Sequence, residues 1–206
     1  LTPLVLDEDF ETTPLSRPPV TPGSIAPTWA WEAYGLRVSA SDETAAVGRR
    51  SLCLTEEKTG LPSWAPMLVY RPWHLRGSTR LSFYAQVVRE GELAVLFEDR
   101  SGKDRTLHGP RVAVRRDRIT LLNRPSVPIP PGSWVHVEIT VGLGALSDGT
   151  FDVAVRLADG SRHEVRKVGY RSREWNRLDW LAFSSAADGS STAFLDSIQL
   201  TNLAGR

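Results

Sequence analysis

The sequence predicts an all-β protein, a two-sheet antiparallel β-sandwich of jelly-roll type, and three observations support this prediction. Short runs of alternating apolar and polar residues follow one another through most of the 206 residues, and this alternation is typical of half-buried strands. Turn segments rich in Gly, Asp and Ser separate the runs. No stretch keeps the 3.6-residue apolar period that an amphipathic helix would need. Ten or so short strands at this spacing indicate a sandwich.

Each expected strand is an alternating run bounded by turn residues. In chain order they are 3–10, 49–56, 79–88, 91–99, 110–123 (two short strands around a turn), 133–143, 149–160, 162–170, 179–186 and 191–202. Two Pro-rich segments, 12–30 and 57–75, do not alternate and are expected to be irregular, with an edge strand around "MLVY" in the second. No linker or change in composition divides the chain, so one domain is expected over residues 1–206.

The overall composition excludes several classes of protein. Apolar residues make up 41% of the chain, charged residues 24%, and the formal net charge is +1. These values argue against a disordered chain and against a general nucleic-acid binder. No apolar run approaches the roughly 18 residues of a membrane span, and no signal peptide is visible at the start. The lone Cys53 excludes an internal disulfide.

One charged residue conflicts with the strand pattern. In "STAFLDSIQLTN", residues 191–202, strict alternation places Asp196 on the same face as Phe194, Ile198 and Leu200. A carboxylate on an apolar row needs an ion pair, hydrogen bonds or a metal ion. We therefore expect Asp196 to have a specific partner.

Several segments together resemble the concanavalin A-like lectin and glucanase superfamily, in particular laminin G-like jelly-roll domains of bacterial accessory proteins. The opening "DEDFE" is followed by a Pro-rich loop, a Trp and "AAVGRRSLCLTE". The closing "LDWLAFSSAADGSSTAFLDSIQL" is similar to the last hairpin of that superfamily. Galactose-binding-like jelly rolls share the "DFE … G-x-x-SL … D-x-I-x-L" skeleton and remain the alternative fold.

The resemblance implies a structural calcium site, because many jelly rolls of both kinds hold calcium between the first and last strands. The matching positions here are Asp9 or Glu11, the carbonyl groups around Gly48, and Asp196. Calcium binds six to eight oxygen atoms and accepts such a mixture. Without metal, Asp196 would pair with an Arg or cap a backbone turn.

Aromatic rings outside the regular strands are the candidate ligand-binding residues, because a ring face can cover the C–H face of a sugar. These are Trp29 and Trp31 after the Pro-rich loop, Trp73 and His74 in the second irregular segment, and Trp175 in the loop "SREWNRLDW". Trp134 and Trp180 lie in alternating strands and are expected in the core.

Arg residues are concentrated in "RHEVRKVGYRSREWNR", which includes Arg171, and in a second group around Arg115. Guanidinium groups that share a surface could bind the sulfate or uronate groups of an acidic glycan. Alternating Arg is also typical of a solvated strand face, so both interpretations stay open.

The resemblance implies a non-catalytic carbohydrate-binding or accessory module of an exported bacterial protein, extracellular, periplasmic or at the cell surface. Its partner would be a polysaccharide or glycan, with neighbouring domains of a larger protein as a further possibility. One alternative is a glycan-active hydrolase or polysaccharide lyase on the same fold. His163, Tyr170 and Arg171 or Asn176 supply the residue types of a lyase but match no signature. A structural or protein-interaction domain is the third class.

Overall fold

The computed structural model describes residues 2–20, 23–25, 35–57, 64–102, 105–186 and 190–203. Its regular elements are almost all strands, and one short 3₁₀ turn, η1 (Gly144–Leu146), is the exception within the described part of the chain. No helix among these residues is long and apolar enough to cross a membrane.

Two antiparallel sheets make up the fold, and strands that follow one another in the sequence often belong to different sheets. Sheet A has the order β13-β12-β11-β6-β15-β4-β3, with β1 also paired to β15, and sheet B has the order β10-β9-β8-β7-β14-β5-β2. The strands of sheet A are β1 (Leu6–Glu8), β3 (Leu36–Ser41), β4 (Ser51–Glu56), β6 (Gly77–Val87), β11 (Val135–Leu143), β12 (Thr150–Arg156), β13 (Arg162–Gly169) and β15 (Ser191–Leu203). The strands of sheet B are β2 (Ser24–Ile25), β5 (Met67–Tyr70), β7 (Glu92–Asp99), β8 (Leu107–Arg115), β9 (Arg118–Leu121), β10 (Val127–Pro128) and β14 (Trp180–Ala186).

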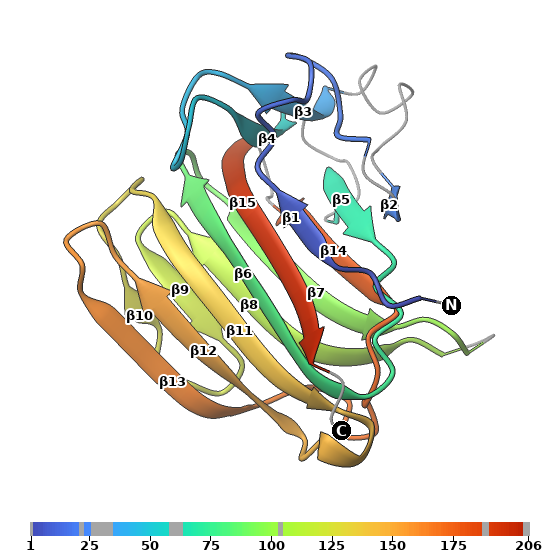
Figure 1. Cartoon of the computed structure of the whole chain (residues 1–206). Coiled ribbons are helices and arrows are strands. Elements are labelled where there is room, and N and C mark those ends of the chain that lie inside the picture. The colour runs from blue at the N-terminus through green and yellow to red at the C-terminus, as the bar shows by residue number, and fades with distance from the viewer. Residues whose placement is uncertain are drawn as a thin grey trace.

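The predicted all-β sandwich is confirmed, including the pairing of the first strand with the last. In Figure 1, β1 lies beside β15 in the front sheet, and the two are antiparallel with Leu6 opposite Leu200. β3 is an addition, because its alternating sequence "LRVSAS" lies in a stretch for which no strand was expected. It pairs with β4 and forms the far edge of sheet A.

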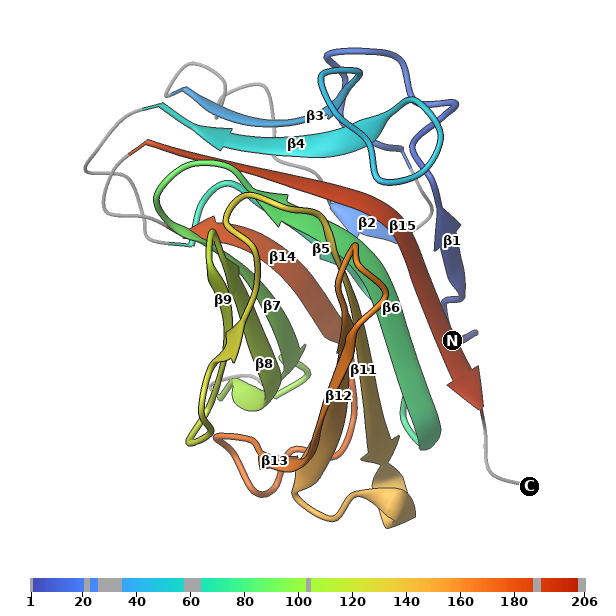
Figure 2. The same ribbon diagram turned by 90° about the vertical axis from the view of Figure 1, so that its left-hand side faces the viewer.

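Figure 2 shows that sheet A curves around sheet B. Because the two sheets pack face to face, the outer face of sheet A is convex and the outer face of sheet B is concave. The space between them is filled by one cluster of buried apolar side chains from both sheets, for example Phe83, Val137 and Leu200 from sheet A and Val95 and Phe183 from sheet B. Burial of these rows provides the main driving force for folding.

A β-bulge in β15 changes the expected position of Asp196. The pairing of β15 with β6 shifts between Asp196 and Gln199, and Ser197 has a φ of 48°. Leu195 and Ile198 both belong to the core cluster, so one extra residue reverses the alternation there. Asp196 therefore does not share a face with Ile198 and Leu200, which corrects the expectation from strict period two. It lies on the outer side of sheet A, under the loop before β4.

Candidate functional site

A groove of about 1090 Å³ lies on the outer, concave side of sheet B. Side chains of β7, β8 and β9 contribute to its lining, and Trp64 and the segment 169–171 also border it. The residues that could contact a ligand there are Trp64, Leu96, Glu98, His108, Arg111, Thr120 and Arg171. The groove thus combines an aromatic ring, cationic groups and hydroxyl groups.

Strand register explains which side chains reach this face. Val95 and Phe97 of β7 point into the core, so Leu96 and Glu98 between and after them point outward. Small residues occupy the middle of the sheet, since Ala94 stands opposite both Ala113 of β8 and Ser184 of β14. These small side chains are almost fully buried, so the groove is lined by the larger residues around them.

Glu98 and His108 form a hydrogen-bonded pair at one end of the groove. The two residues are opposite each other on β7 and β8, and Nδ1 of His108 lies 3.0 Å from Oε1 of Glu98. The Glu98 side chain is only 6% exposed, whereas that of His108 is 44% exposed. The carboxylate favours a proton on Nδ1 of the imidazole, and Nε2 has no hydrogen-bond partner within the described residues.

Two guanidinium groups line the groove beyond this pair. Arg111 is half exposed and forms an ion pair with Glu92. Arg171 is exposed, and no ion pair joins it to any residue of the described ranges. The sequence prediction of Arg171 as a ligand-binding residue therefore has a geometric basis, and it stays a prediction.

Aromatic rings and Arg side chains alternate on the side of the Glu98–His108 pair that faces β14 and β5. The guanidinium carbon of Arg71 lies 4.7 Å from the ring centroid of Trp73 and 5.5 Å from that of Trp180, and Arg100 lies 4.1 Å from Trp180. We call Trp73, Arg71, Trp180 and Arg100 the Arg–Trp ladder. Trp180 was expected in the core, but it points outward because the neighbouring Leu181 is the residue that points inward.

Acidic partners hold both Arg residues of the ladder. Nε of Arg71 donates to the carbonyl oxygen of Asp179 at 3.0 Å, and Nε of Arg100 donates to Oε2 of Glu98 at 2.6 Å. Oδ1 of Asp179 accepts the backbone N–H of Arg100 at 2.7 Å. The ladder and the Glu98–His108 pair are therefore parts of one connected network.

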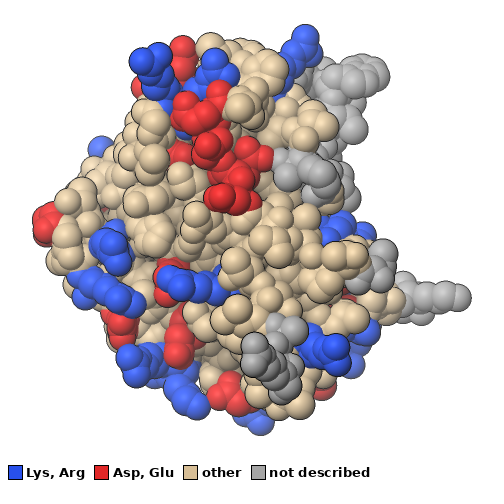
Figure 3. Space-filling view, viewed as in Figure 1, with Lys and Arg blue, Asp and Glu red and all other residues tan. Residues whose placement is uncertain are grey.

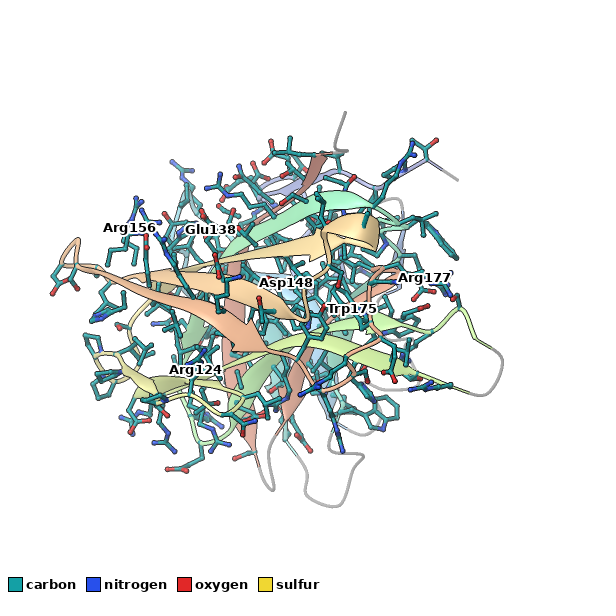
Figure 4. All side chains as sticks on the ribbon, turned by 90° about the horizontal axis from the view of Figure 1, so that it is seen from below. Arg124, Glu138, Asp148, Arg156, Trp175 and Arg177 are labelled. Carbon is teal, nitrogen blue, oxygen red and sulfur yellow. The ribbon has the colours of Figure 1, made fainter. Side chains whose placement is uncertain are left out.

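Two of the predicted ligand-binding residues are buried instead. Trp175 is 0% exposed and packs against Phe97 and Tyr170, so it belongs to the core rather than to an exposed loop (Figure 4). His74 is also 0% exposed, with Nδ1 2.9 Å from Oγ1 of Thr79 and Nε2 2.7 Å from the carbonyl oxygen of Leu4. Both expectations are corrected, because these side chains offer no surface to a ligand.

The other aromatic and lyase candidates are spread over the molecule. Trp73 is half-buried in the ladder, whereas Trp29 and Trp31 lie outside the described residues. His163 is exposed on β13, far along the chain from the His108 strand. The Tyr170 hydroxyl lies 2.6 Å from Oγ of Ser147 and donates to the Trp175 carbonyl oxygen at 3.1 Å, which marks a structural role.

The predicted calcium ligands meet at the loop before β4, where they accept backbone hydrogen bonds. Oδ2 of Asp196 accepts the N–H groups of Ala46 and Val47 at 2.8 and 2.9 Å. Oε1 of Glu11 accepts those of Arg49 and Arg50, both at 2.8 Å. Gly48 has a φ of +70°, and a Cβ there would lie 2.4 Å from Oε1 of Glu11, so only Gly allows this approach.

These hydrogen bonds do not fit a calcium cage as they stand. Oδ2 of Asp196 and Oε1 of Glu11 face the positive ends of N–H groups, and Oδ1 of Asp9 accepts the N–H of Glu11. Among the described residues, no group of three or more Asp, Glu, His or Cys side chains is arranged to hold a metal. Burial raises the pKa of Asp196, and the N–H groups of Val47 and Ala46 oppose that rise. Calcium stays a prediction from the resemblance.

The convex face has a different character from the groove. Figure 3 shows a patch of acidic side chains on the upper part of the sheet A side and mainly Lys and Arg below it. Many of the basic groups there are paired, for instance Arg80 with Glu138 and Arg162 with Glu164. This pairing supports the solvated-face interpretation for the Arg residues of β13.

Comparison with known proteins supports the fold only. No protein-family model matches the chain, and no curated protein matches it. Among solved structures, the endo-β-1,4-glucuronan lyase of the fungus Trichoderma reesei has a TM-score of 0.55 at 12% identity, covering 98% of this chain and 96% of the lyase. The cellulose-induced protein Cip1 has a TM-score of 0.56 at 15% identity, covering 97% of this chain and 98% of Cip1. A CBM22-1–CBM22-2 tandem domain of Xyn10C from Paenibacillus barcinonensis has a TM-score of 0.51 at 16% identity, covering 98% of this chain and 46% of that one. The chain thus has the jelly-roll β-sandwich fold that these proteins share.

Proposed function

We propose that this protein binds an acidic polysaccharide in the groove on the concave face of sheet B. The observation that carries the proposal is the groove lining, in which Arg111, Arg171 and His108 lie together with Trp64 and Thr120. Guanidinium groups suit carboxylate and sulfate groups, and hydroxyl and aromatic groups suit a sugar ring. A carbohydrate-binding module and a polysaccharide lyase among the similar structures support this substrate class.

Titration calorimetry with the whole chain tests this proposal. Glucuronan, alginate and neutral xylan serve as ligands. We expect the acidic polymers to bind and their affinity to fall with added salt, because screening weakens exposed ion pairs. The variant Arg111→Gln should weaken binding about tenfold, the order expected for a lost charged hydrogen bond. A matched control is Arg80→Gln on the convex face. No binding to either acidic polymer would refute the proposal.

A second candidate is a polysaccharide lyase, and the Glu98–His108 pair is the specific observation that favours it. With its Nδ1 proton directed at Glu98, His108 presents the lone pair of Nε2 to the groove. In a β-elimination, Nε2 would take the C5 proton of a uronate and the C4–O bond would break. The electron pair would leave on the glycosidic oxygen, which takes a proton from water, and a C4=C5 double bond would form. Arg111 or Arg171 would neutralise the carboxylate.

Ultraviolet absorbance of the C4=C5 double bond distinguishes binding from lyase activity. If the protein is a lyase, incubation with glucuronan or alginate produces this absorbance, and His108→Ala abolishes it while binding persists. His163→Gln serves as the control because His163 is exposed on another sheet. Binding without any absorbance change supports the non-catalytic module.

We also propose that the protein is exported, and the calcium ion that the resemblance implies stays an expectation because Asp196 and Glu11 already accept backbone N–H groups. A thermal melt of the purified chain, with calcium and with a chelator, tests the metal. A ligand of the native state must raise the melting temperature. Equal melting temperatures in both buffers would contradict calcium binding. The backbone N–H groups would then be the partners that stabilise Asp196 and Glu11.

A further inference from the structure

The register of sheet B places its charged groups in one row across the strands. His108 of β8 stands opposite Glu98 of β7, and Glu98 stands opposite Trp180 of β14. Arg71 directly follows Tyr70, which is the last residue of β5 and the partner of Leu181, so Arg71 stands beside Trp180. From His108 to Arg71 is three strand spacings, roughly 14 Å at about 4.8 Å per strand. This row is longer than a single sugar residue.

The Arg–Trp ladder at the far end of the row is held rigid. Arg71 lies between two Trp rings, and Asp179, which is 1% exposed, fixes its position. Arg100 stacks on Trp180 and donates through Nε and Nη2 to Glu98. Stacking and ion pairing remove rotamer freedom before any ligand arrives, so binding at these groups has a smaller entropic cost.

Both guanidinium groups keep hydrogen-bond donors for a ligand. A guanidinium has five N–H donors, and the contacts of Arg71 and Arg100 with the described residues use Nε and Nη2. Both side chains are about one third exposed. Among the described residues, the Nη1 groups have no partner and are therefore the donors available to a ligand at this end of the row.

We infer that Arg71 and Arg100 form a second anion-binding subsite, separated from Arg111 and Arg171 by the Glu98–His108 pair. The ligand that fits both ends is an extended acidic oligosaccharide rather than a single acidic sugar, with carboxylate or sulfate groups repeated along the chain. Trp73, at the outer end of the ladder, supplies an apolar surface beside this subsite. This inference rests on the proposed glycan binding and adds the length and charge spacing of the ligand.

The test compares oligouronates of different length by titration calorimetry on the whole chain. The wild-type protein should bind a hexasaccharide at least tenfold more tightly than a disaccharide, because only the longer ligand reaches both subsites. Arg71→Gln, which keeps Arg100 and the Glu98–His108 pair in place, should weaken hexasaccharide binding about tenfold and leave disaccharide binding at Arg111 and Arg171 unchanged. Trp73→Ala should follow the same pattern.

Controls separate this inference from the proposed function and from a purely structural ladder. Arg71→Lys keeps a positive charge beside Asp179 in case Arg71→Gln does not fold, and Arg80→Gln on the convex face should change neither ligand. If the hexasaccharide and the disaccharide bind equally, or if ladder variants weaken both equally, the second subsite is refuted while glycan binding stands. If no oligouronate binds, the proposed function itself fails.

Discussion

Three nearly buried carboxylates, those of Glu98, Asp179 and Asp196, are stabilised by different kinds of donor. Glu98 has the His108 ring and the Arg100 guanidinium, Asp179 has Arg71 and the Arg100 N–H, and Asp196 has two backbone N–H groups. Hydrogen bonds of this kind offset the cost of removing a charge from water. The sequence indicates that such residues need partners, but the partners of Asp196 are about 150 residues away.

We expect replacement of Trp175 to affect stability rather than ligand choice. Its buried ring fills the space beside Phe97, and a Cβ on Gly109 would lie 2.4 Å from it. Trp175→Ala should lower the free energy of unfolding by about 3–5 kcal/mol, the usual cost of such a cavity. Denaturant unfolding curves measure this loss.

Trp175→Phe is the matched control for that experiment. The Trp175 indole N–H has no hydrogen-bond partner within the described part of the chain, so Phe removes an unsatisfied donor together with part of the ring. Its loss of stability should be clearly smaller than that of the Ala variant. Equal losses would mean that the ring does not pack as described.

His74 should make stability depend on pH. Burial lowers the pKa of this imidazole in the folded protein, and the hydrogen bond with the Leu4 carbonyl only partly opposes it. Below the unfolded-state pKa of about 6.5, unfolded chains take up the proton first, so the free energy of unfolding should fall as the pH is lowered from 7 towards the depressed folded-state pKa.

Unfolding curves at several pH values for His74→Gln and for the exposed His163→Gln check this expectation. The first variant should flatten the pH dependence relative to the wild type, and the second should leave it unchanged. His136, whose pKa burial also lowers, accounts for the slope that remains in His74→Gln. An unchanged slope in His74→Gln would contradict the assignment.

At the scale of the elements, alternation predicted most strands but not their irregularities. The expected strands at 79–88 and 133–143 correspond to β6 and β11. The bulge in β15 could not be read from the sequence, because nothing in "LDSIQ" distinguishes a bulged strand from a regular one. Trp180 was expected in the core because it lies in an alternating strand, and only the register with β7 shows which face it occupies.

The loop before β4 gives a prediction at this scale. Glu11 accepts the N–H groups of Arg49 and Arg50, and these hydrogen bonds lower the pKa of Glu11. Glu11→Ala should free this loop, so trypsin should cleave after Arg49 or Arg50 much faster than in the wild type. Peptide mass spectrometry identifies the cleavage sites, and Glu43→Ala in the same region is the control. Equal cleavage rates would show that Glu11 does not hold the loop.

The whole molecule depends on a core that both sheets share. If residues 1–206 form one domain, as the sequence predicts, heating should give one cooperative transition with coincident loss of secondary and tertiary structure. Circular dichroism in the far and near ultraviolet measures both. Two separate transitions would contradict the single-domain prediction.

The site is also a property of the whole molecule, because its residues come from strands that are distant in the sequence. The sequence therefore predicted less of the site than of the fold. Composition and alternation are local properties, and they led to the sandwich. The row from His108 to Arg71 is assembled from β8, β7, β14 and the end of β5, and the chain order of these strands differs from their order in the sheet. The sequence predicts Arg171 as a candidate because the segment around it is rich in Arg. Glu98 and His108 become candidates only when the sheet places them opposite each other.

The bulge at Ser197 has a consequence for insertions and deletions in this chain. The extra residue reverses the alternation by residue number. Odd-numbered residues such as Leu195 face the core before the bulge, and even-numbered residues such as Ile198 face it afterwards. Deleting Ser197 would remove the extra residue, and the resulting regular strand would still direct Leu195, Ile198 and Leu200 to the core. Deleting two residues there would instead turn Ile198 and Leu200 towards solvent and Gln199 and Thr201 into the core. The last strand can therefore lose its extra residue at this position, whereas the loss of a second residue would expose the apolar row.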